Sequence, residues 1–204
     1  MLFRSAALHL IAACGLTTLW GWGLMWWTPT FLMRAYSLSA GQAGAITGPI
    51  HLAGGVLATV LTGWYVAQPA MADPRRVLWF LSAVSVVGTF ASALVYFAHS
   101  RAMVSVGLWI FIPSIYIYIG PGFGLLNNMA EPRMRALFCA TSLFVANFAN
   151  LVIGPQIIGM LSDWIAAVHG SNTTSLRFAL LCIVPTGFWS AFHYVRCARH
   201  IPAA

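Results

Sequence analysis

The sequence predicts an all-α membrane protein with six transmembrane helices, for three reasons. Of its 204 residues, 60% are hydrophobic and only 6% are charged, and the mean hydropathy of +0.84 exceeds that of water-soluble domains. A bilayer core about 30 Å thick requires roughly 20 apolar residues per helix, and six intervals between charged residues reach about that length. Apolar and polar residues within them do not alternate with the period of two that membrane barrels require, so helices are expected.

Charged residues and turn-forming segments set the limits of the six expected spans. The first follows Arg4, and the second begins after the turn-like segment SLSAGQAG at 37–44. The third and fifth follow the arginine-containing loops ADPRR and EPRMR, and the fourth and sixth begin next to Arg101 and Arg177. The expected spans cover residues 8–33, 44–67, 77–98, 103–129, 136–162 and 177–196.

The ten arginines predict the orientation, because positive charge in short loops favours the cytoplasmic side and six helices place both termini on one side. Seven fall on that side, namely Arg4, Arg75, Arg76, Arg133, Arg135, Arg196 and Arg199, and three on the other, namely Arg34, Arg101 and Arg177. We therefore expect cytoplasmic termini. The all-arginine, alanine-rich usage indicates a bacterial genome of high GC content, and the expected location is the bacterial inner membrane. The formal charge of +7 is spread over loop ends, so we expect contact with lipid headgroups and no nucleic-acid binding.

The expected spans contain no arrangement for catalysis or for binding a cofactor or metal. They hold no Asp or Glu, and the cysteines occur singly without Cys-x-x-Cys spacing. A haem between His9 and His193 is geometrically conceivable, but isolated interfacial histidines are the commoner case. We therefore expect no enzyme activity, no cofactor and no metal. His51 is the only plausible titrating group at some depth in these spans.

Several spans contain residues that interrupt helices. The fourth contains GPGFG at 120–124, and the fifth contains GPQIIG at 154–159. Proline removes a backbone hydrogen bond and kinks a helix, while glycine allows helices to approach closely in lipid. Such breaks occur in helices that bend or line a cavity, although they are also frequent in ordinary membrane helices. Asn147 and Asn150 of the fifth span either line such a cavity or join helices by hydrogen bonds.

The chain resembles a known family in the order and spacing of five segments. It is similar to the carboxyl-terminal six helices of a major facilitator superfamily transporter, nearest to the spinster-like or organic-anion porters. The similarity covers about residues 5–196 and is carried by the segments WWTPTFLMRAYSLSAGQAG, GGVLATVLTGW, ADPRRVLWF, EPRMRALFCATSLFVANFANLVIGPQIIGMLSD and SLRFALL.

The chain departs from that family in two respects, a loop signature and its length. Its members usually have a Gly-x-x-x-Asp-Arg-x-Gly-Arg signature after the second of these helices. TGWYVAQPAMADPRR keeps Gly63 and the arginines but has Ala67 and Gln68 where the acid is expected, with Asp73 as a possible substitute. The second departure is length, because a complete transporter has two six-helix halves. The chain is therefore expected to be a fragment, a split subunit that pairs with an amino-terminal half, or, less favoured, a homodimer.

The resemblance implies secondary active transport of a small organic solute by alternating access, with this bundle rocking against an amino-terminal bundle. It places the first and fourth spans at the cavity. The candidate substrate contacts, which include two asparagines of the fifth span, are Trp20, Trp26, Trp27, Tyr116, Tyr118, Asn147 and Asn150. The candidate gating and packing residues are Gly63, Gly120, Pro121, Arg133, Arg135, Gly154, Pro155, Gly159 and Asp163.

The expected partners are membrane lipid, a small-molecule substrate and a second six-helix half. If the assembly is driven by protons, the essential acid is expected in that other half, because this one offers only His51. The alternative interpretation is a membrane scaffold or regulatory subunit that does not transport, or a degenerate transporter fragment. The altered loop after the second span favours this alternative, and the intact helices argue against it.

Overall fold

The computed structural model describes residues 2–170 and 172–201, and these residues form helices joined by short connections, with no β-strand among them. In chain order the elements are α1 (Leu2–Tyr36), α2 (Ala40–Pro49), a π-helical turn (Ile50–Gly54), α3 (Gly55–Val66), a 3₁₀ turn (Pro69–Met71), α4 (Pro74–Phe97), α5 (Arg101–Ile117), α6 (Ile119–Met129), α7 (Arg135–Asn147), a second π-helical turn (Phe148–Ile153), α8 (Gly154–His169), α9 (Asn172–Ile183) and α10 (Thr186–His200).

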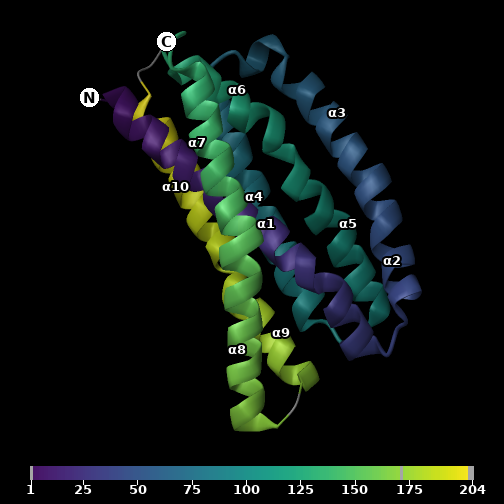
Figure 1. Ribbon diagram of the computed structural model, residues 1–204. Coiled ribbons are helices and arrows are strands. Elements are labelled where there is room, and N and C mark those ends of the chain that lie inside the picture. Colours follow the sequence, from purple (N-terminus) through teal and green to yellow (C-terminus); the bar gives the residue numbers. More distant parts are fainter. Residues whose placement is uncertain (1, 171, 202–204) are drawn as a thin grey trace.

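Six stretches are long and apolar enough to cross a membrane, which confirms the predicted all-α fold with six spans. They are Ser5–Tyr36 (α1), Ala40–Val66 (α2–α3), Pro74–Phe97 (α4), Arg101–Met129 (α5–α6), Arg135–Val168 (α7–α8) and Thr173–His200 (α9–α10). Both termini lie at the same end of the bundle (Figure 1). An even number of crossings requires this arrangement.

The second span begins earlier than its sequence suggested. Of the expected turn at 37–44, only residues 37–39 lie outside helices, and Ser37 has a positive φ of 54°. The side chain of Ser39 accepts a hydrogen bond from the Gln42 backbone N–H at 3.2 Å, and the Gln42 side chain accepts one from the Ser39 N–H at 2.9 Å. This capping box satisfies two backbone donors and starts α2 at Ala40.

Proline explains the interruption of the fourth span. α5 ends at Ile117 and α6 begins at Ile119, so the helix is broken at Tyr118. Pro121 lies four residues after Ile117, lacks the N–H that would bond to the Ile117 carbonyl, and crowds that carbonyl with its ring. The sixth span is interrupted in the same way, because Pro185 lies between α9 and α10.

The second and fifth spans each contain a π-helical turn. The turn Ile50–Gly54 directly follows Pro49, and the turn Phe148–Ile153 directly precedes Gly154 and Pro155. The buried residues of the fifth span are separated by multiples of four, at Ser142, Ala146, Gly154, Ile158 and Ser162, and the half-buried Asn150 lies at the position between Ala146 and Gly154. A repeat of four would drift around an α-helix of 3.6 residues per turn. The wider π turn compensates for this drift and keeps the stripe facing the bundle.

The core of the bundle surrounds Trp20 of α1, whose side chain is fully buried. Its indole Nε1 donates a hydrogen bond to Ser92 Oγ at 3.0 Å, and its ring centroid lies 5.3 Å from that of Phe111. Glycine makes room for the indole on two neighbouring helices. A Cβ added at Gly88 of α4 or Gly187 of α10 would lie 2.6 Å or 3.0 Å from Trp20. Trp20 thus joins α1, α4, α5 and α10.

Arg177 of α9 satisfies the carbonyl groups at the end of α4. Its guanidinium donates hydrogen bonds to the backbone oxygens of Tyr96 at 2.9 Å, Phe97 at 3.1 Å and Ala98 at 3.0 Å, and lies 5.3 Å from the centroid of the Phe31 ring. The last carbonyls of a helix have no partner within the helix, and a cation there also complements the helix dipole. Arg177 therefore links two spans at the end opposite the termini.

We expect Arg177→Gln to lower the free energy of unfolding by about 1–2 kcal/mol, the contribution of partly exposed hydrogen bonds to a charged group. The measurement is unfolding of the purified chain in a mild detergent. Arg34→Gln is the matched control, because Arg34 is exposed at the end of α1 and should change the free energy by less than about 0.5 kcal/mol. Equal effects of the two substitutions would show that the carbonyl contacts contribute little.

Candidate functional site

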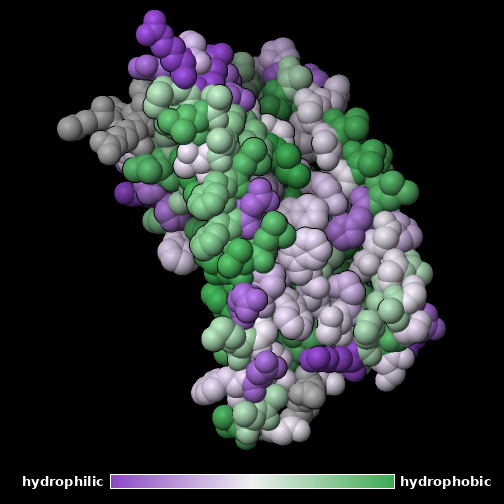
Figure 2. All heavy atoms as spheres, viewed as in Figure 1, coloured by the Kyte–Doolittle hydropathy of each residue, from purple (hydrophilic) through white to green (hydrophobic). Residues whose placement is uncertain are grey.

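The two least buried spans flank one side of the bundle. In the most apolar part of each span, 17% of residues are buried in α7–α8 and 28% in α2–α3, against 61% in α1. In Figure 1, α1 and α5 are visible between these two flanking spans. Figure 2, viewed from the same side, shows a band of white and purple atoms between more hydrophobic flanks. We call this side, between α2–α3 and α7–α8, the open face.

Five aromatic or polar side chains from four spans meet in what we call the aromatic-polar cluster: Trp22, Trp26, His51, Tyr116 and Asn150. His51 Nδ1 lies 2.9 Å from Tyr116 Oη. The Trp22 ring centroid lies 6.1 Å from that of His51, with nearly parallel planes, and 5.3 Å from that of Tyr116, edge to face. Trp26 Nε1 donates a hydrogen bond to Asn150 Oδ1 at 2.8 Å.

Local sequence explains why these side chains converge. Trp22 and Trp26 are four residues apart on α1, so they lie on the same side of that helix. His51 and Asn150 lie in the two π-helical turns, which displace side chains from regular α-helical positions and are frequent at functional sites. The cluster offers an imidazole, a phenol, an amide and two indoles, and therefore both hydrogen-bonding groups and flat apolar surfaces for an organic molecule.

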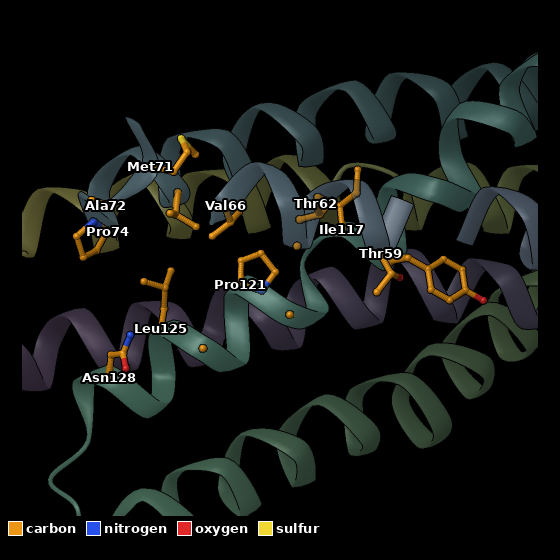
Figure 3. Close-up of a pocket in the computed structure, with 15 residues that line it drawn as sticks. Thr59, Thr62, Val66, Met71, Ala72, Pro74, Ile117, Pro121, Leu125 and Asn128 are labelled. Carbon is orange, nitrogen blue, oxygen red and sulfur yellow. The ribbon is translucent and has the colours of Figure 1, made fainter. Parts of the chain in front are cut away.

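Two cavities border the cluster. A hollow of about 200 Å³, here called the outer hollow, is lined by Trp22, Met25, Trp26, Pro29, Thr47 and His51. A groove of about 480 Å³, here called the α3–α6 groove, reaches from Thr59 and Tyr116 to Asn128. In Figure 3, Pro121 and Leu125 of α6 lie opposite Val66 of α3 across this groove.

The structure brings three of the predicted substrate contacts together, because Trp26, Tyr116 and Asn150 all belong to the cluster. Trp27 lies close by, with its Nε1 donating to the Pro155 carbonyl at 3.2 Å. Asn147 is exposed at the end of α7, immediately before the π turn that carries Asn150.

Trp20 and Tyr118 lie elsewhere, which corrects their expected position at the cavity. Trp20 has no exposed surface and Tyr118 is only 5% exposed. Trp20 points into the core described above, and Tyr118 packs with Leu125 and Leu126 in a second buried cluster between α1, α4, α6 and α10. A solute could contact neither without displacing packed helices, so neither belongs to the candidate site.

The predicted gating and packing residues fall into three groups. At Gly154 of α8, an added Cβ would lie 3.1 Å from the Gly23 Cα of α1, and at Gly159 it would lie 3.2 Å from Trp27. These glycines, with Pro155 between them, border α1. At Gly63 and Gly120 an added Cβ would meet nothing within 4 Å, and both residues line the α3–α6 groove together with Pro121. The charged members are exposed. Arg133 and Arg135 lie in and after the α6–α7 connection, whereas Asp163 lies within α8, which continues to His169.

Hydrogen bonds of Asp73, Arg75 and Arg76 stabilise the loop after the second span. Asp73 caps α4, with its carboxylate accepting a hydrogen bond from the Arg75 N–H at 2.9 Å. The Arg75 guanidinium donates to the Ile201 carbonyl at 2.9 Å, and Arg76 Nη1 donates to the Ala70 carbonyl at 2.8 Å. Asp73 therefore acts as a helix cap that positions an arginine against the C-terminal segment.

The pair His9 and His193 does not have haem geometry. Their Nδ1 atoms lie 2.9 Å from each other and their ring centroids are 5.0 Å apart, so the rings contact each other directly. Among the described residues, no group of three or more His, Cys, Asp or Glu side chains is placed to hold a metal ion.

Sequence reasoning missed Trp22 and the pairing of His51 with Tyr116. Trp22 could have been found from its spacing, because it precedes Trp26 by one helical turn. The partner of His51 lies 65 residues away on another span, and no local pattern indicates such a contact.

A six-helix bundle with both termini at one end and interrupted helices around a central polar cluster is the architecture of one half of a major facilitator superfamily (MFS) transporter. Comparison with known proteins agrees. The chain is 29% identical over 185 residues to an MFS-type efflux pump of Mycolicibacterium smegmatis (strain ATCC 700084 / mc(2)155), an alignment that covers 90% of this chain and 42% of that protein. No family model matches the chain.

Solved structures of a bacterial homologue of the human lysosomal transporter Spinster have the same fold. The inward-facing, unoccupied form matches with a TM-score of 0.83 and 19% identity, covering 98% of this chain and 50% of that one. The inward-facing, occupied form matches with a TM-score of 0.80 and 18% identity, covering 97% and 50%. The chain spans about half the length of these proteins, and the predicted six-helix half of the superfamily fold is confirmed.

Proposed function

We propose that this chain is the carboxyl-terminal half of a secondary transporter that moves a small organic solute by alternating access. The observation that carries the proposal is the position of the aromatic-polar cluster, which is built from four spans, faces the open side and includes both π-helical turns. The similarity to an MFS-type efflux pump supports the same conclusion. The chain would then act by binding and moving its solute, with no enzymatic step.

The partner in this proposal is a second six-helix bundle that covers the open face. Asn147 is exposed within the fifth span, and Asn150 and His51 are partly exposed. Hydrocarbon cannot satisfy such polar groups, so facing them toward another bundle or a water-filled cavity is favoured over facing them toward lipid. We propose an amino-terminal half as that partner, and a second copy of this chain is the less favoured version.

We expect Asn150→Leu to reduce transport about 5- to 10-fold, the equivalent of losing one net hydrogen bond. The assay is export of fluorescent cationic, anionic and neutral dyes from cells that make this chain together with its amino-terminal half. Gln156→Leu is the matched control, because Gln156 is an exposed amide on the same span, outside the cluster. If both halves fold and no dye moves with the unaltered chain, the non-transporting alternative would be favoured.

Orientation gives a separate prediction. Cysteine introduced at Arg199 should react with a membrane-impermeant reagent only from the cytoplasmic side of a bacterial inner membrane, and cysteine at Arg101 only from the opposite side. Arg101 follows three spans and Arg199 lies at the end of the sixth, so the two positions should differ. Labelling of both from the same side would contradict the six-span topology, and the reversed pattern would contradict the proposed orientation.

A further inference from the structure

The outer hollow and the α3–α6 groove meet at one pair of side chains. Tyr116 forms part of the wall of the groove, and His51 forms part of the wall of the hollow. The two residues are joined by the hydrogen bond of 2.9 Å between Tyr116 Oη and His51 Nδ1. The groove extends from this pair toward Asn128 near the α6–α7 connection, the end at which the termini lie (Figures 1 and 3). The hollow extends toward Pro29 and Thr47, near the opposite end.

We propose that the His51–Tyr116 pair is the gate between two access routes for the solute, one through the groove and one through the hollow. The gate rests on the proposed transport function, since it divides the path that a solute would take. When α2–α3 and α5–α6 are in contact, the paired rings separate the two cavities. When the two spans part at this point, the cavities join.

Three contacts hold the pair closed. The imidazole and the phenol satisfy each other's polar groups, and this bond persists whichever tautomer His51 adopts, because the hydroxyl can donate or accept. The Trp22 ring packs against both the His51 ring and the Tyr116 ring and so supports their contact. Gly55 lets α3 approach the Tyr116 ring, since a Cβ there would lie 2.9 Å from it. A larger residue at Gly55 would hold the gate apart.

The same elements allow the pair to separate. His51 lies in a π-helical turn directly after Pro49, and Tyr116 lies between Pro113 and the helix break at Tyr118. Proline and π turns both remove regular i→i−4 hydrogen bonds, so both spans have a natural point of bending here. The second span is also lightly held, with 28% of its most apolar part buried. A single hydrogen bond contributes little net free energy, so it opposes separation of the two rings only weakly.

The test uses cysteine reporters in membrane vesicles of both orientations from cells that make the full chain. Gly63→Cys reports on the groove and Thr47→Cys on the hollow, in a background where the accessible Cys139 and Cys182 are serine. With the pair intact, a membrane-impermeant methanethiosulfonate should label Gly63→Cys from the side of the termini and Thr47→Cys from the other side only. Labelling of Thr47→Cys at equal rates from both sides would overturn the proposal.

Removing the gate should open the second route. We expect Tyr116→Ala to raise labelling of Thr47→Cys from the side of the termini at least tenfold, and Tyr116→Phe, which keeps the ring but loses the bond, to raise it about fivefold. Tyr36→Phe is the matched control, because the Tyr36 hydroxyl donates to the Ala98 carbonyl far from the cluster. No rise in a Tyr116→Ala protein whose Gly63→Cys labelling is normal would overturn the gate.

This readout needs no transported solute, so the gate and the transport function can fail separately. Transport that is sensitive to Asn150→Leu, together with side-independent labelling of Thr47→Cys, would reject the gate alone. Side-dependent labelling that Tyr116→Ala abolishes would support the gate even where no tested dye is moved.

Discussion

Replacing Trp20 with alanine should lower the free energy of unfolding by about 3–5 kcal/mol, the usual cost of truncating a fully buried indole. The side chain has no exposed surface, and its Nε1–H bonds to Ser92 Oγ at 3.0 Å. The substitution would leave a cavity where α1, α4, α5 and α10 meet and would leave the Ser92 hydroxyl without this donor. Unfolding of the purified chain in a mild detergent, followed by far-UV circular dichroism, measures the effect.

Trp26→Ala is the matched control, because Trp26 lies on the same helix but is 55% exposed. It should lower the free energy of unfolding by less than about 1 kcal/mol, while reducing transport through loss of the contact with Asn150. Trp20→Ala should therefore mainly lower the free energy of unfolding, whereas Trp26→Ala should mainly lower transport. Equal destabilisation by the two substitutions would show that Trp20 is not the centre of the core.

The contrast between these tryptophans shows that the sequence predicts a span but does not predict which of its side chains are buried. Hydropathy and charge spacing predicted six helical spans, because a bilayer imposes the same length and composition on any helix that crosses it. Which side of α1 faces the bundle depends on contacts with helices far away in sequence. Trp20, Trp26 and Trp27 are all large aromatic residues in one apolar stretch. Trp20 is the buried one, and Gly88 and Gly187 on two other spans leave room for its indole.

The tyrosines of the fourth span illustrate a prediction that helix geometry could have refined. Tyr116 and Tyr118 are two residues apart, and residues at that spacing do not share a helix face. Both were predicted to contact the substrate, although this spacing allows only one of them to face the cavity, and the structure places Tyr118 in the core. The helix break at Tyr118, caused by Pro121, does not bring the two rings back to one side.

The sequence predicted that some helices would be interrupted, but it did not predict that two of the interruptions would be π-helical turns. The prolines at 49, 121 and 155 are visible in the sequence, and each lies in or beside a break or a π turn. The sequence does not reveal that the two π turns would place His51 and Asn150 on either side of Trp22 and Trp26. That placement depends on how α2–α3 and α7–α8 pack against α1 and α5.

Gly154→Val should destabilise the contact between α8 and α1 and reduce transport together with stability. An added Cβ would lie 3.1 Å from the Gly23 Cα and 3.3 Å from the Ala149 carbonyl oxygen, and valine adds two methyl groups beyond it. Gly23 has no side chain that could move away, so the helices must separate. Overpacking of this kind costs about 1–3 kcal/mol of unfolding free energy.

The loss of transport should exceed the loss of stability, because the displaced helix also carries the site. Asn150 lies one turn before Gly154, and moving α8 away from α1 would lengthen the 2.8 Å hydrogen bond between Asn150 and Trp26. We expect dye export to fall at least tenfold, beyond any fall in the amount of folded protein. Gly44→Val is the matched control, since an added Cβ at Gly44 meets nothing within 4 Å, and it should fold and transport like the unaltered chain. If Gly154→Val retained both full stability and full export, the small residues at 154 and 23 would not determine how closely α8 approaches α1.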